Sequence, residues 1–307
     1  MAKVLVATVK PFAPAAVEQI KLIADKAGYD VQLLEKYANQ SDFVNAVADV
    51  DALIVRSDKV TREVIEKGNN LKVVVRAGAG YDNLDLEAAT EKGVVAMNTP
   101  GQNSNAVAEL AIGMMIFNAR NGFNGKAGKE LKGKSIGIHA YGNVGRIVGN
   151  LAKGFGMKVY AFDPFLSKEA IEKDGVIALS SVEDLYSTCQ YISLHIPATE
   201  KTINSINFDL LSKMPKGATL VNTARKEVVC EESLLKIFDK RDDFNYISDI
   251  APDCKDVISE KYEGRCFFTP KKMGAQTAEA NINSGVAAIN QIINYIEKGD
   301  KTFQVNK

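Results

Sequence analysis

The chain has 307 residues, of which 46% are hydrophobic and 25% are charged, and its 38 basic and 38 acidic residues give a formal net charge of zero. This composition is typical of a folded globular protein and excludes a disordered or fibrous chain. The neutral balance gives no general attraction to nucleic acid or to an anionic membrane. The length exceeds one compact core and predicts two domains.

The cysteine and histidine content excludes further classes. Four cysteines share no metal-type spacing, and the only histidines are His139 and His195, so we predict no metal site and reduced, mostly buried thiols. The first ten residues hold too short an apolar segment for a signal peptide or a membrane helix. We therefore expect a cytoplasmic protein that binds neither nucleic acid nor a membrane.

The N-terminal part of the chain alternates strands and helices. Residues 3–9 are predicted to form a strand, and residues 14–28 an amphipathic helix that ends at Gly28. Further short apolar strands are predicted at residues 31–34, 52–55 and 71–77, with helical stretches between them. Such a repeat is typical of a parallel sheet.

Arginines and glycines follow two of these strands. Arg56 and Ser57 come after one strand, and the next strand ends in Arg76, Ala77, Gly78, Ala79 and Gly80. Ligands of open α/β sheets bind beyond the carboxyl ends of the strands, and arginines beside freed backbone N–H groups can hold a carboxylate. We predict an anionic ligand here. The alternative is that Arg56 and Arg76 are ordinary solvent-exposed arginines at the ends of loops and bind no ligand.

A break in the pattern marks the first domain boundary. Residues 98–101 read Asn-Thr-Pro-Gly, and a helix is predicted over residues 105–120. This helix is apolar on most faces, so it must be buried on several sides, between domains or between subunits. We place the boundary after residue 98.

Residues 134–164 read as a strand, a tight turn, a helix and a second strand. The turn AYGNVG fits G-x-G-x-x-G with Ala140 in place of the first glycine. Gly142 would let the backbone approach a pyrophosphate at the helix N-terminus, and Gly145 would let the helix pack close to the strand. Asp163 ends the second strand, where a carboxylate accepts the ribose hydroxyls of NAD and repels the 2′-phosphate of NADP.

The remaining chain completes this nucleotide-binding unit and then leaves it. Strands are predicted at residues 191–196, 219–221, 246–249 and 266–269. A long helix after Gly274 is expected to carry the chain back to the first domain, and the tail 301–307 to add a strand or a cap.

Several loops together identify a family. In order they are RSDKVTREVI, RAGAGYDNLD, NTPGQNSNAVAEL, GIHAYGNVGR, HIPAT, LVNTAR and TPKKMGAQTAEA. The chain resembles the NAD-dependent D-2-hydroxyacid dehydrogenases, and most closely the short D-3-phosphoglycerate dehydrogenases without a C-terminal regulatory domain. The resemblance implies an α/β fold of two Rossmann-like or flavodoxin-like domains with parallel sheets, in which residues 99–282 form an NAD domain inserted into a substrate domain of residues 1–98 and 283–307. We also expect a homodimer.

The resemblance assigns roles residue by residue. Arg225 would hold the carboxylate and carbonyl oxygen of a small anionic 2-hydroxy acid, and Asp249 would contact the nicotinamide carboxamide. The remaining cofactor contacts would come from Gly142, Asn143, Val144, Asp163, His195, Pro197, Thr223, Ala224 and Gly274. The loop of Arg76, Gly78 and Ala79 would bind the substrate carboxylate, and Arg56, Ser57 and Asn103 would contact the rest of the substrate.

The sequence departs from the family at the catalytic acid/base. The family's histidine follows a Thr-Pro pair, and here the slot reads TPKKMG, one residue longer, so either Lys271 or Lys272 takes its place. The supporting glutamate is missing too, with only shorter acids near residues 253–256. A carboxylate beside a lysine would raise the lysine pKa further above neutrality, so losing both groups together is chemically coherent. The chain thus resembles a lysine-type subgroup, with Asp253 as a fallback proton carrier.

The sequence therefore predicts NAD-dependent oxidation of D-3-phosphoglycerate in serine synthesis. One alternative on the same scaffold is a glyoxylate or hydroxypyruvate reductase. An alternative of another class is a NAD-sensing binding protein like the family's corepressor members. Arg225 together with a proton donor favours an enzyme.

Overall fold

The computed structural model describes residues 1–306, and the chain divides into two compact units. The first unit consists of Met1–Asn103 and the segment that begins at Gln276, and the second unit is Ser104–Ala275. Each holds one parallel sheet with helices on both faces, so the predicted α/β fold class is confirmed. The junctions differ from the expected 98/99 and 282/283, because position 282 lies within a continuous helix, Ala278–Lys298, that belongs to the first unit.

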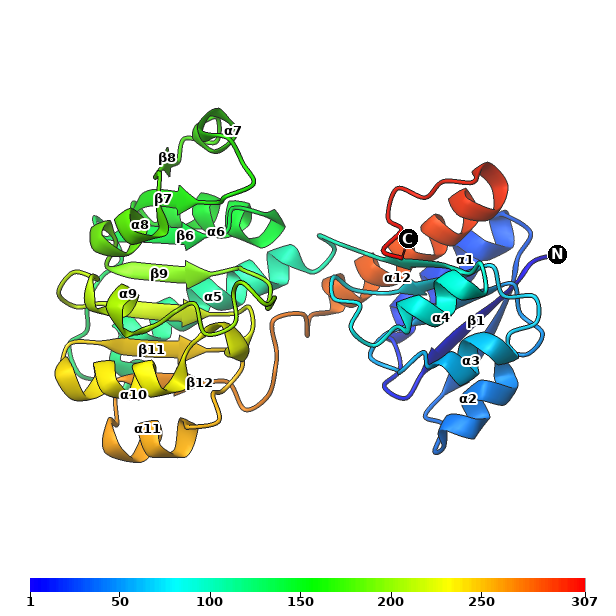
Figure 1. Ribbon diagram of the computed structural model, residues 1–307, viewed down its shortest axis with the longest axis horizontal. Coiled ribbons are helices and arrows are strands. Elements are labelled where there is room, and N and C mark those ends of the chain that lie inside the picture. The colour runs from blue at the N-terminus through cyan, green and yellow to red at the C-terminus, as the bar shows by residue number, and fades with distance from the viewer. Residues whose placement is uncertain (307) are drawn as a thin grey trace. The chain divides into compact units, whose positions relative to one another are not determined.

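The first unit contains a five-stranded sheet in the order β2-β1-β3-β4-β5 (Figure 1). Its strands are β1 (Lys3–Thr8), β2 (Asp30–Glu35), β3 (Ala52–Val55), β4 (Val73–Arg76) and β5 (Val95–Asn98), and all neighbours are parallel. Its helices are α1 (Pro14–Lys26), α2 (Gln40–Ala46), α3 (Arg62–Lys67), α4 (Leu86–Glu91) and α12 (Ala278–Lys298).

Alternating strand residues of this sheet feed two apolar layers. Val4, Val6 and Ile54 pack with Ile20 of α1 and Ile289 of α12 on one face. On the other face, Leu5, Ala7 and Leu53 pack with residues of α2, α3 and α4. The period-2 alternation of a strand thus buries both faces of the sheet, as expected for a parallel sheet. This explains why α12 joins the first unit.

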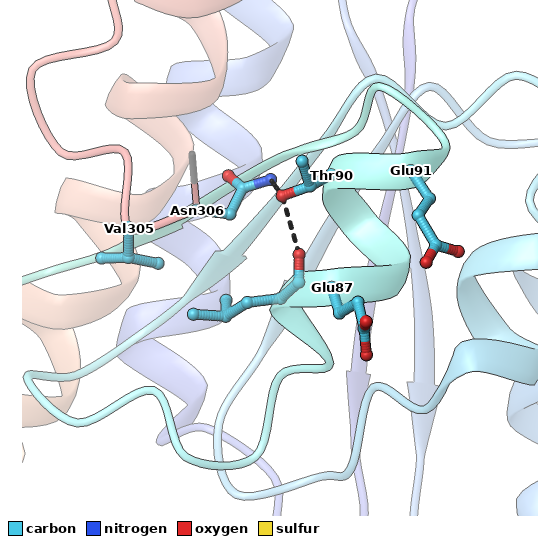
Figure 2. Close-up of a pocket in the computed structure, with 6 residues that line it drawn as sticks. Glu87, Thr90, Glu91, Val305 and Asn306 are labelled. Carbon is cyan, nitrogen blue, oxygen red and sulfur yellow. Dashed lines mark hydrogen bonds between the residues drawn. The ribbon is translucent and has the colours of Figure 1, made fainter.

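The C-terminal tail caps the edge strand β5, as the sequence analysis had allowed. Gln304 forms an antiparallel bridge with Met97, and the Val305 N–H donates to the Ala96 carbonyl at 2.8 Å. Asn306 accepts from the Ala96 N–H at 2.8 Å and donates to Thr90 Oγ1 at 3.1 Å (Figure 2). A shallow hollow of about 410 Å³ lies between α4 and this tail. The tail therefore satisfies backbone groups that an open edge would expose.

The second unit contains a seven-stranded parallel sheet in the order β12-β11-β10-β9-β6-β7-β8 (Figure 1). Its strands are β6 (Ser135–His139), β7 (Lys158–Phe162), β8 (Ile177–Ala178), β9 (Tyr191–Leu194), β10 (Thr219–Asn222), β11 (Asn245–Ser248) and β12 (Cys266–Phe268). Its helices are α5 (Ser104–Ala119), α6 (Asn143–Gly154), α7 (Lys168–Glu172), α8 (Val182–Thr188), α9 (Phe208–Ser212), α10 (Glu231–Lys240) and α11 (Lys255–Lys261), with the 3₁₀ turns η1 (Asn121–Phe123) and η2 (Lys226–Val228).

The apolar helix α5 packs inside the second unit, against α6 and against strands β10, β11 and β12. Its residues Ala108, Ala111, Ile112 and Met115 join one of the two cores of this unit. The other core lies under α8, α9 and α10 on the opposite face of the sheet. Burial on more than one side explains why the helix has no polar stripe.

Candidate active site

The turn between β6 and α6 has the geometry of a phosphate-binding turn. Ala140 has a φ of 76°, a left-handed conformation that glycine adopts at lower cost. A Cβ on Gly145 would lie 2.4 Å from the Ala140 carbonyl oxygen, so the close approach of helix and strand requires glycine there. A Cβ on Gly142 would meet nothing within 4 Å. The turn is thus tightly packed at Gly145 and open at Gly142, where a pyrophosphate was predicted.

The start of α6 offers hydrogen-bond donors to an anion. Gly142 is its N-cap residue and provides no side-chain cap, while Asn143 and Val144 form the first turn of the helix. The first backbone N–H groups of a helix lack partners within the helix, and they carry its positive dipole end. Gly142 and Asn143 are exposed, so a ligand can reach these donors.

Asp163 stands immediately beyond β7 and holds this turn. Its Oδ2 accepts the Tyr141 N–H at 2.8 Å, and its Oδ1 accepts the Phe165 N–H at 2.9 Å. A carboxylate oxygen has more than one lone-pair site, so these bonds leave capacity for ribose hydroxyls.

The reversal of strand order places further loops beside the turn. The chain passes from β6 to β7 on one side, and β9 pairs with β6 on the other, so the crevice of this sheet lies at the carboxyl ends of β6 and β9. The residues expected to line it follow the strands β9 and β10 directly: His195, Pro197, Thr223 and Ala224. Thr223 Oγ1 is buried and has no hydrogen-bond partner within residues 1–306. A polar ligand at this edge would satisfy it.

Both histidines are held neutral by their surroundings. His139 is 8% exposed, its Nδ1 lies 3.4 Å from the Tyr186 hydroxyl, and desolvation lowers its pKa to about 4. The His195 Nε2 lies 2.9 Å from Ser193 Oγ. Desolvation, with His139 nearby, also lowers the pKa of His195, to about 3, although the side chain keeps some solvent exposure. Neither is suited to carry a proton near neutral pH.

Arg225 lies in a loop that a buried asparagine shapes. Asn222 is completely buried, its Nδ2 donates to the Arg225 carbonyl at 2.9 Å, and its Oδ1 accepts the Ala224 N–H at 2.9 Å. The Arg225 Nη1 donates to the Ala224 carbonyl at 2.9 Å. The remaining guanidinium N–H groups can still bind an anionic ligand. Asn222 is the first residue of the NTAR motif, and the sequence pattern alone indicates no role for it.

The loop after β12 carries Lys271 and Lys272, and both side chains are exposed. The carboxylate of Asp249, which is 1% exposed, accepts the N–H groups of Met273 at 2.7 Å and Gly274 at 2.8 Å. The Thr269 hydroxyl lies 2.9 Å from the same carboxylate and 2.9 Å from the Lys271 carbonyl oxygen. Asp249 therefore contacts both ends of the lysine segment, an arrangement that the sequence analysis missed.

The hydrogen bonds of Asp253 are with Lys226 and Glu231. Its carboxylate lies 2.5 Å from Lys226 Nζ on the surface, and this hydrogen bond raises the pKa of Lys226. Glu231 accepts the Asp253 N–H at 2.6 Å and the Cys254 N–H at 2.9 Å. The acid that approaches the lysine segment is thus Asp249, and not one of the acids near residues 253–256.

The first unit brings the predicted substrate residues of two strands together. The Arg76 Nε donates to the Arg56 carbonyl at 3.0 Å, and a Cβ on Gly78 would collide with the Arg76 guanidinium. The Arg56 Nη1 donates to the carbonyls of Lys10 at 3.1 Å and Pro11 at 2.9 Å. Burial lowers the pKa of Arg56. Only part of the Arg56 guanidinium thus remains for a ligand.

The other predicted substrate residues of this unit flank these arginines in sequence. Ser57 and Ala79 are exposed, and Asn103 is half-buried directly before α5. The Asn83 side chain, which was not predicted, donates to the Asp58 carbonyl at 2.7 Å and joins the loop after β3 to the loop after β4.

Residues 1–306 lack two features that mark other classes of protein. None of the helices there is long and apolar enough to cross a membrane. No group of three or more His, Cys, Asp or Glu side chains in that range could hold a metal ion. All four cysteines are free.

The chain belongs to the D-isomer-specific 2-hydroxyacid dehydrogenases, because the model of that family's catalytic domain matches residues 4–306. It is an enzyme of this family, and its cofactor is NAD. The open glycine turn, the unpaired Thr223 hydroxyl and the acid beyond β7 fit that cofactor.

Three similar proteins illustrate the match. The crystal structure of NAD⁺-bound 3-phosphoglycerate dehydrogenase from Entamoeba histolytica superposes with a TM-score of 0.89 at 47% identity, over 100% of this chain and 99% of that one. Hydroxypyruvate reductase of Thermotoga maritima is 33% identical over 91% of this chain and 95% of its own length. D-3-phosphoglycerate dehydrogenase of Methanocaldococcus jannaschii is 40% identical over 64% of this chain, which spans only 40% of that protein.

Proposed function

We propose that the chain oxidises D-3-phosphoglycerate to 3-phosphohydroxypyruvate with NAD, the step that feeds serine synthesis. The observation that carries this proposal is the 47% identity, over the whole chain, to a 3-phosphoglycerate dehydrogenase. The arginine-bearing loops after β3 and β4 support it, because a substrate with a carboxylate at one end and a phosphate at the other can use two positively charged contacts.

The two units would have different roles, one in binding the cofactor and the other in binding the substrate. The second unit would bind NAD through Gly142, Asn143, Val144 and Asp163 on one side of the crevice, with His195, Pro197, Thr223, Ala224, Asp249 and Gly274 on the other. The first unit would bind the substrate, with Gly78, Ala79 and Arg76 at its carboxylate and Arg56, Ser57 and Asn103 at its phosphate end. We further propose a cytoplasmic homodimer.

The chemistry requires one hydride and one proton to leave the substrate. NAD held by the second unit would supply the acceptor for the hydride of C2. A lysine of the loop after β12, Lys271 or Lys272, takes the proton of the C2 hydroxyl. Arg225 orients the substrate carboxylate and stabilises the negative charge that develops on the C2 oxygen.

A hydroxypyruvate or glyoxylate reductase is the second candidate. The specific observation in its favour is the match to the Thermotoga maritima hydroxypyruvate reductase over 95% of that protein's length. The scaffold and the chemistry at C2 would be the same, so the two candidates differ only in the groups that meet the far end of the substrate.

One assay separates them. NAD reduction is measured with D-3-phosphoglycerate, D-glycerate and D-lactate, and NADH oxidation with 3-phosphohydroxypyruvate, hydroxypyruvate and glyoxylate. We expect kcat/KM to be highest for the phosphorylated substrate. A higher kcat/KM for hydroxypyruvate than for 3-phosphohydroxypyruvate would favour the reductase.

A further inference from the structure

The segment that follows β1 holds the guanidinium of Arg56. Residues 9–13 belong to no helix or strand, yet they contact this side chain in more than one way. The Arg56 Nη1 donates to the carbonyls of Lys10 at 3.1 Å and Pro11 at 2.9 Å. Its Cζ also lies 5.1 Å from the centroid of the Phe12 ring, at a distance where a cation is attracted to the ring. The direction of the guanidinium therefore depends on where this segment lies.

Asp58 bonds to the same segment from the loop after β3. It comes two residues after Arg56, and its side chain is only 7% exposed. Its Oδ1 accepts the Val9 N–H at 2.7 Å and the Tyr37 hydroxyl at 2.8 Å. One carboxylate oxygen thus joins the loops that follow β1, β2 and β3. Hydrogen bonds to an ionised acceptor are stronger than those between neutral groups, so Val9 is firmly held.

The backbone that carries Asp58 is itself fixed by the loop after β4. The Asn83 Nδ2 donates to the Asp58 carbonyl at 2.7 Å, and the Arg76 Nε donates to the Arg56 carbonyl at 3.0 Å. The Asp58 side chain therefore starts from a restrained backbone position. Its bond to Val9 transmits this restraint to the segment after β1.

We propose that Asp58 is a positioning residue for the substrate, which fixes residues 9–12 so that this segment directs the Arg56 guanidinium toward the anionic end of the substrate. This inference rests on the proposed function, in which Arg56 binds the phosphate of D-3-phosphoglycerate. Asp58 itself does not touch the substrate, because its carboxylate is buried and would repel a phosphate.

The two oxygens of Asp58 differ, and this difference allows its hydrogen bonds to be separated from its charge. Both donors bond to Oδ1, whereas Oδ2 is buried and accepts no hydrogen bond within residues 1–306. An asparagine can therefore keep both bonds through its amide oxygen and lose only the charge. Burial lowers the pKa of Arg56, and the Asp58 charge opposes this effect, but the guanidinium stays protonated near neutral pH in either case. We thus expect Asp58→Asn to resemble the parent.

The test compares Asp58→Ala with Asp58→Asn in the full chain. Hydrogen exchange of the Val9 amide is measured, together with kcat and KM for D-3-phosphoglycerate and D-glycerate. In Asp58→Ala we expect faster Val9 exchange and a KM for D-3-phosphoglycerate raised by about threefold to tenfold. Its kcat and the KM for D-glycerate should change little, because a weakened contact with the phosphate alters binding without altering the chemical step. Asp58→Asn should return each quantity to within about twofold of the parent.

A double-mutant cycle tests whether Asp58 acts through Arg56. In an Arg56→Ala background, Asp58→Ala should raise KM no further, because the guanidinium that Asp58 positions is already absent. Thr8→Val serves in case Asp58→Ala does not fold. The Thr8 hydroxyl donates to the Lys10 carbonyl at 2.5 Å, so its loss frees an acceptor of Arg56 and should also raise KM for D-3-phosphoglycerate. An unchanged KM in Thr8→Val would then overturn the inference.

Asp51→Ala is the matched control. Asp51 accepts the Lys3 N–H at 2.9 Å at the start of β1, whereas Asp58 accepts the Val9 N–H beyond the end of that strand. Both substitutions remove a carboxylate that bonds to the backbone of the same part of the chain. Asp51→Ala should leave Val9 exchange and the ratio of the two KM values unchanged.

The outcomes distinguish this inference from the proposed function. Unchanged Val9 exchange in Asp58→Ala overturns the anchoring, whatever the substrate is. Equal rises in KM for both substrates, or additive effects of Asp58→Ala and Arg56→Ala, overturn the action through Arg56. So does an Asp58→Asn variant with a raised KM and a protected Val9 amide. A parent chain that uses D-glycerate as well as D-3-phosphoglycerate contradicts the proposed function instead, and Val9 exchange then still decides whether Asp58 fixes the segment.

Discussion

The Asp163 Oδ2 accepts the Tyr141 N–H at 2.8 Å, so the acid beyond β7 holds the turn that follows β6. One carboxylate thereby shapes the predicted pyrophosphate turn and stands where the ribose of NAD would bind. A substitution that tests the cofactor role of Asp163 must therefore keep its bond to the turn, because removal of the whole carboxylate would also release the turn.

Asp163→Asn is the substitution that separates the two roles. Its amide oxygen can still accept the Tyr141 N–H, although the NH₂ group cannot accept the Phe165 N–H, and the negative charge that repels a 2′-phosphate is lost. We expect the ratio of kcat/KM for NAD over NADP to fall by about tenfold to hundredfold. Steady-state kinetics with both cofactors measure this ratio, and an unchanged ratio would remove Asp163 from cofactor choice.

Arg56→Ala tests recognition of the substrate phosphate. A charge-assisted hydrogen bond contributes roughly 1.5–3 kcal/mol, so we expect kcat/KM for D-3-phosphoglycerate to fall about tenfold to hundredfold, and that for D-glycerate much less. Arg62→Ala is the control, because Arg62 is an exposed arginine of the same unit that pairs with Glu91. An equal fall in kcat/KM with both substrates would mean that Arg56 has only a structural role, through its hydrogen bonds to the Lys10 and Pro11 carbonyls.

The lowered pKa of His139 predicts that the protein loses stability in mild acid. Burial lowers its pKa to about 4, below the value of about 6.5 in an unfolded chain, so the unfolded state binds the proton first as the pH falls. The contribution to stability is present above about pH 6.5 and is lost toward pH 4; it amounts to at most roughly 3 kcal/mol. In His139→Gln, the midpoint of urea unfolding should fall less between pH 7 and pH 5. Equal slopes for variant and parent would contradict this.

The sequence predicted the parts of the fold that depend on local patterns. The glycine turn and the acid beyond β7 follow from spacing, and the left-handed conformation of Ala140 agrees with a position where glycine is usual. Strands β5 and β8 were missed, and β8 has only two residues, too few to carry a periodic signal.

The sequence could not predict contacts between distant segments. No local sequence pattern indicates that Asp249 accepts the N–H groups of Met273 and Gly274, because the backbone conformation of a loop without periodicity cannot be predicted from its sequence. The bonds of Arg56 to the Lys10 and Pro11 carbonyls depend likewise on the adjacent ends of β1 and β3. The kind of ligand that a side chain at a strand end could bind was therefore predictable from the residue type. The hydrogen-bond partners of that side chain within the protein were not.

Lys271→Met and Lys272→Met test the proton carrier. Each change keeps most of the side-chain length and removes the amine. We expect one variant to lower the rate of NAD reduction by about 10²- to 10⁴-fold, the range typical of a lost acid/base, with little change in NADH binding. The other variant should matter much less. Single-turnover formation of NADH measures the step directly, because product release does not enter it.

Lys255→Met is the control for this pair, because Lys255 is an exposed lysine at the start of α11 in the same unit. It should leave the single-turnover rate unchanged. If neither Lys271→Met nor Lys272→Met slows hydride transfer, the lysine mechanism is wrong, and the proton must leave through water or through another group of the site. A slow Lys272→Met variant beside a nearly normal Lys271→Met variant would assign the proton to the residue next to Met273, whose N–H Asp249 accepts. The reverse result would assign it to the residue whose carbonyl the Thr269 hydroxyl contacts.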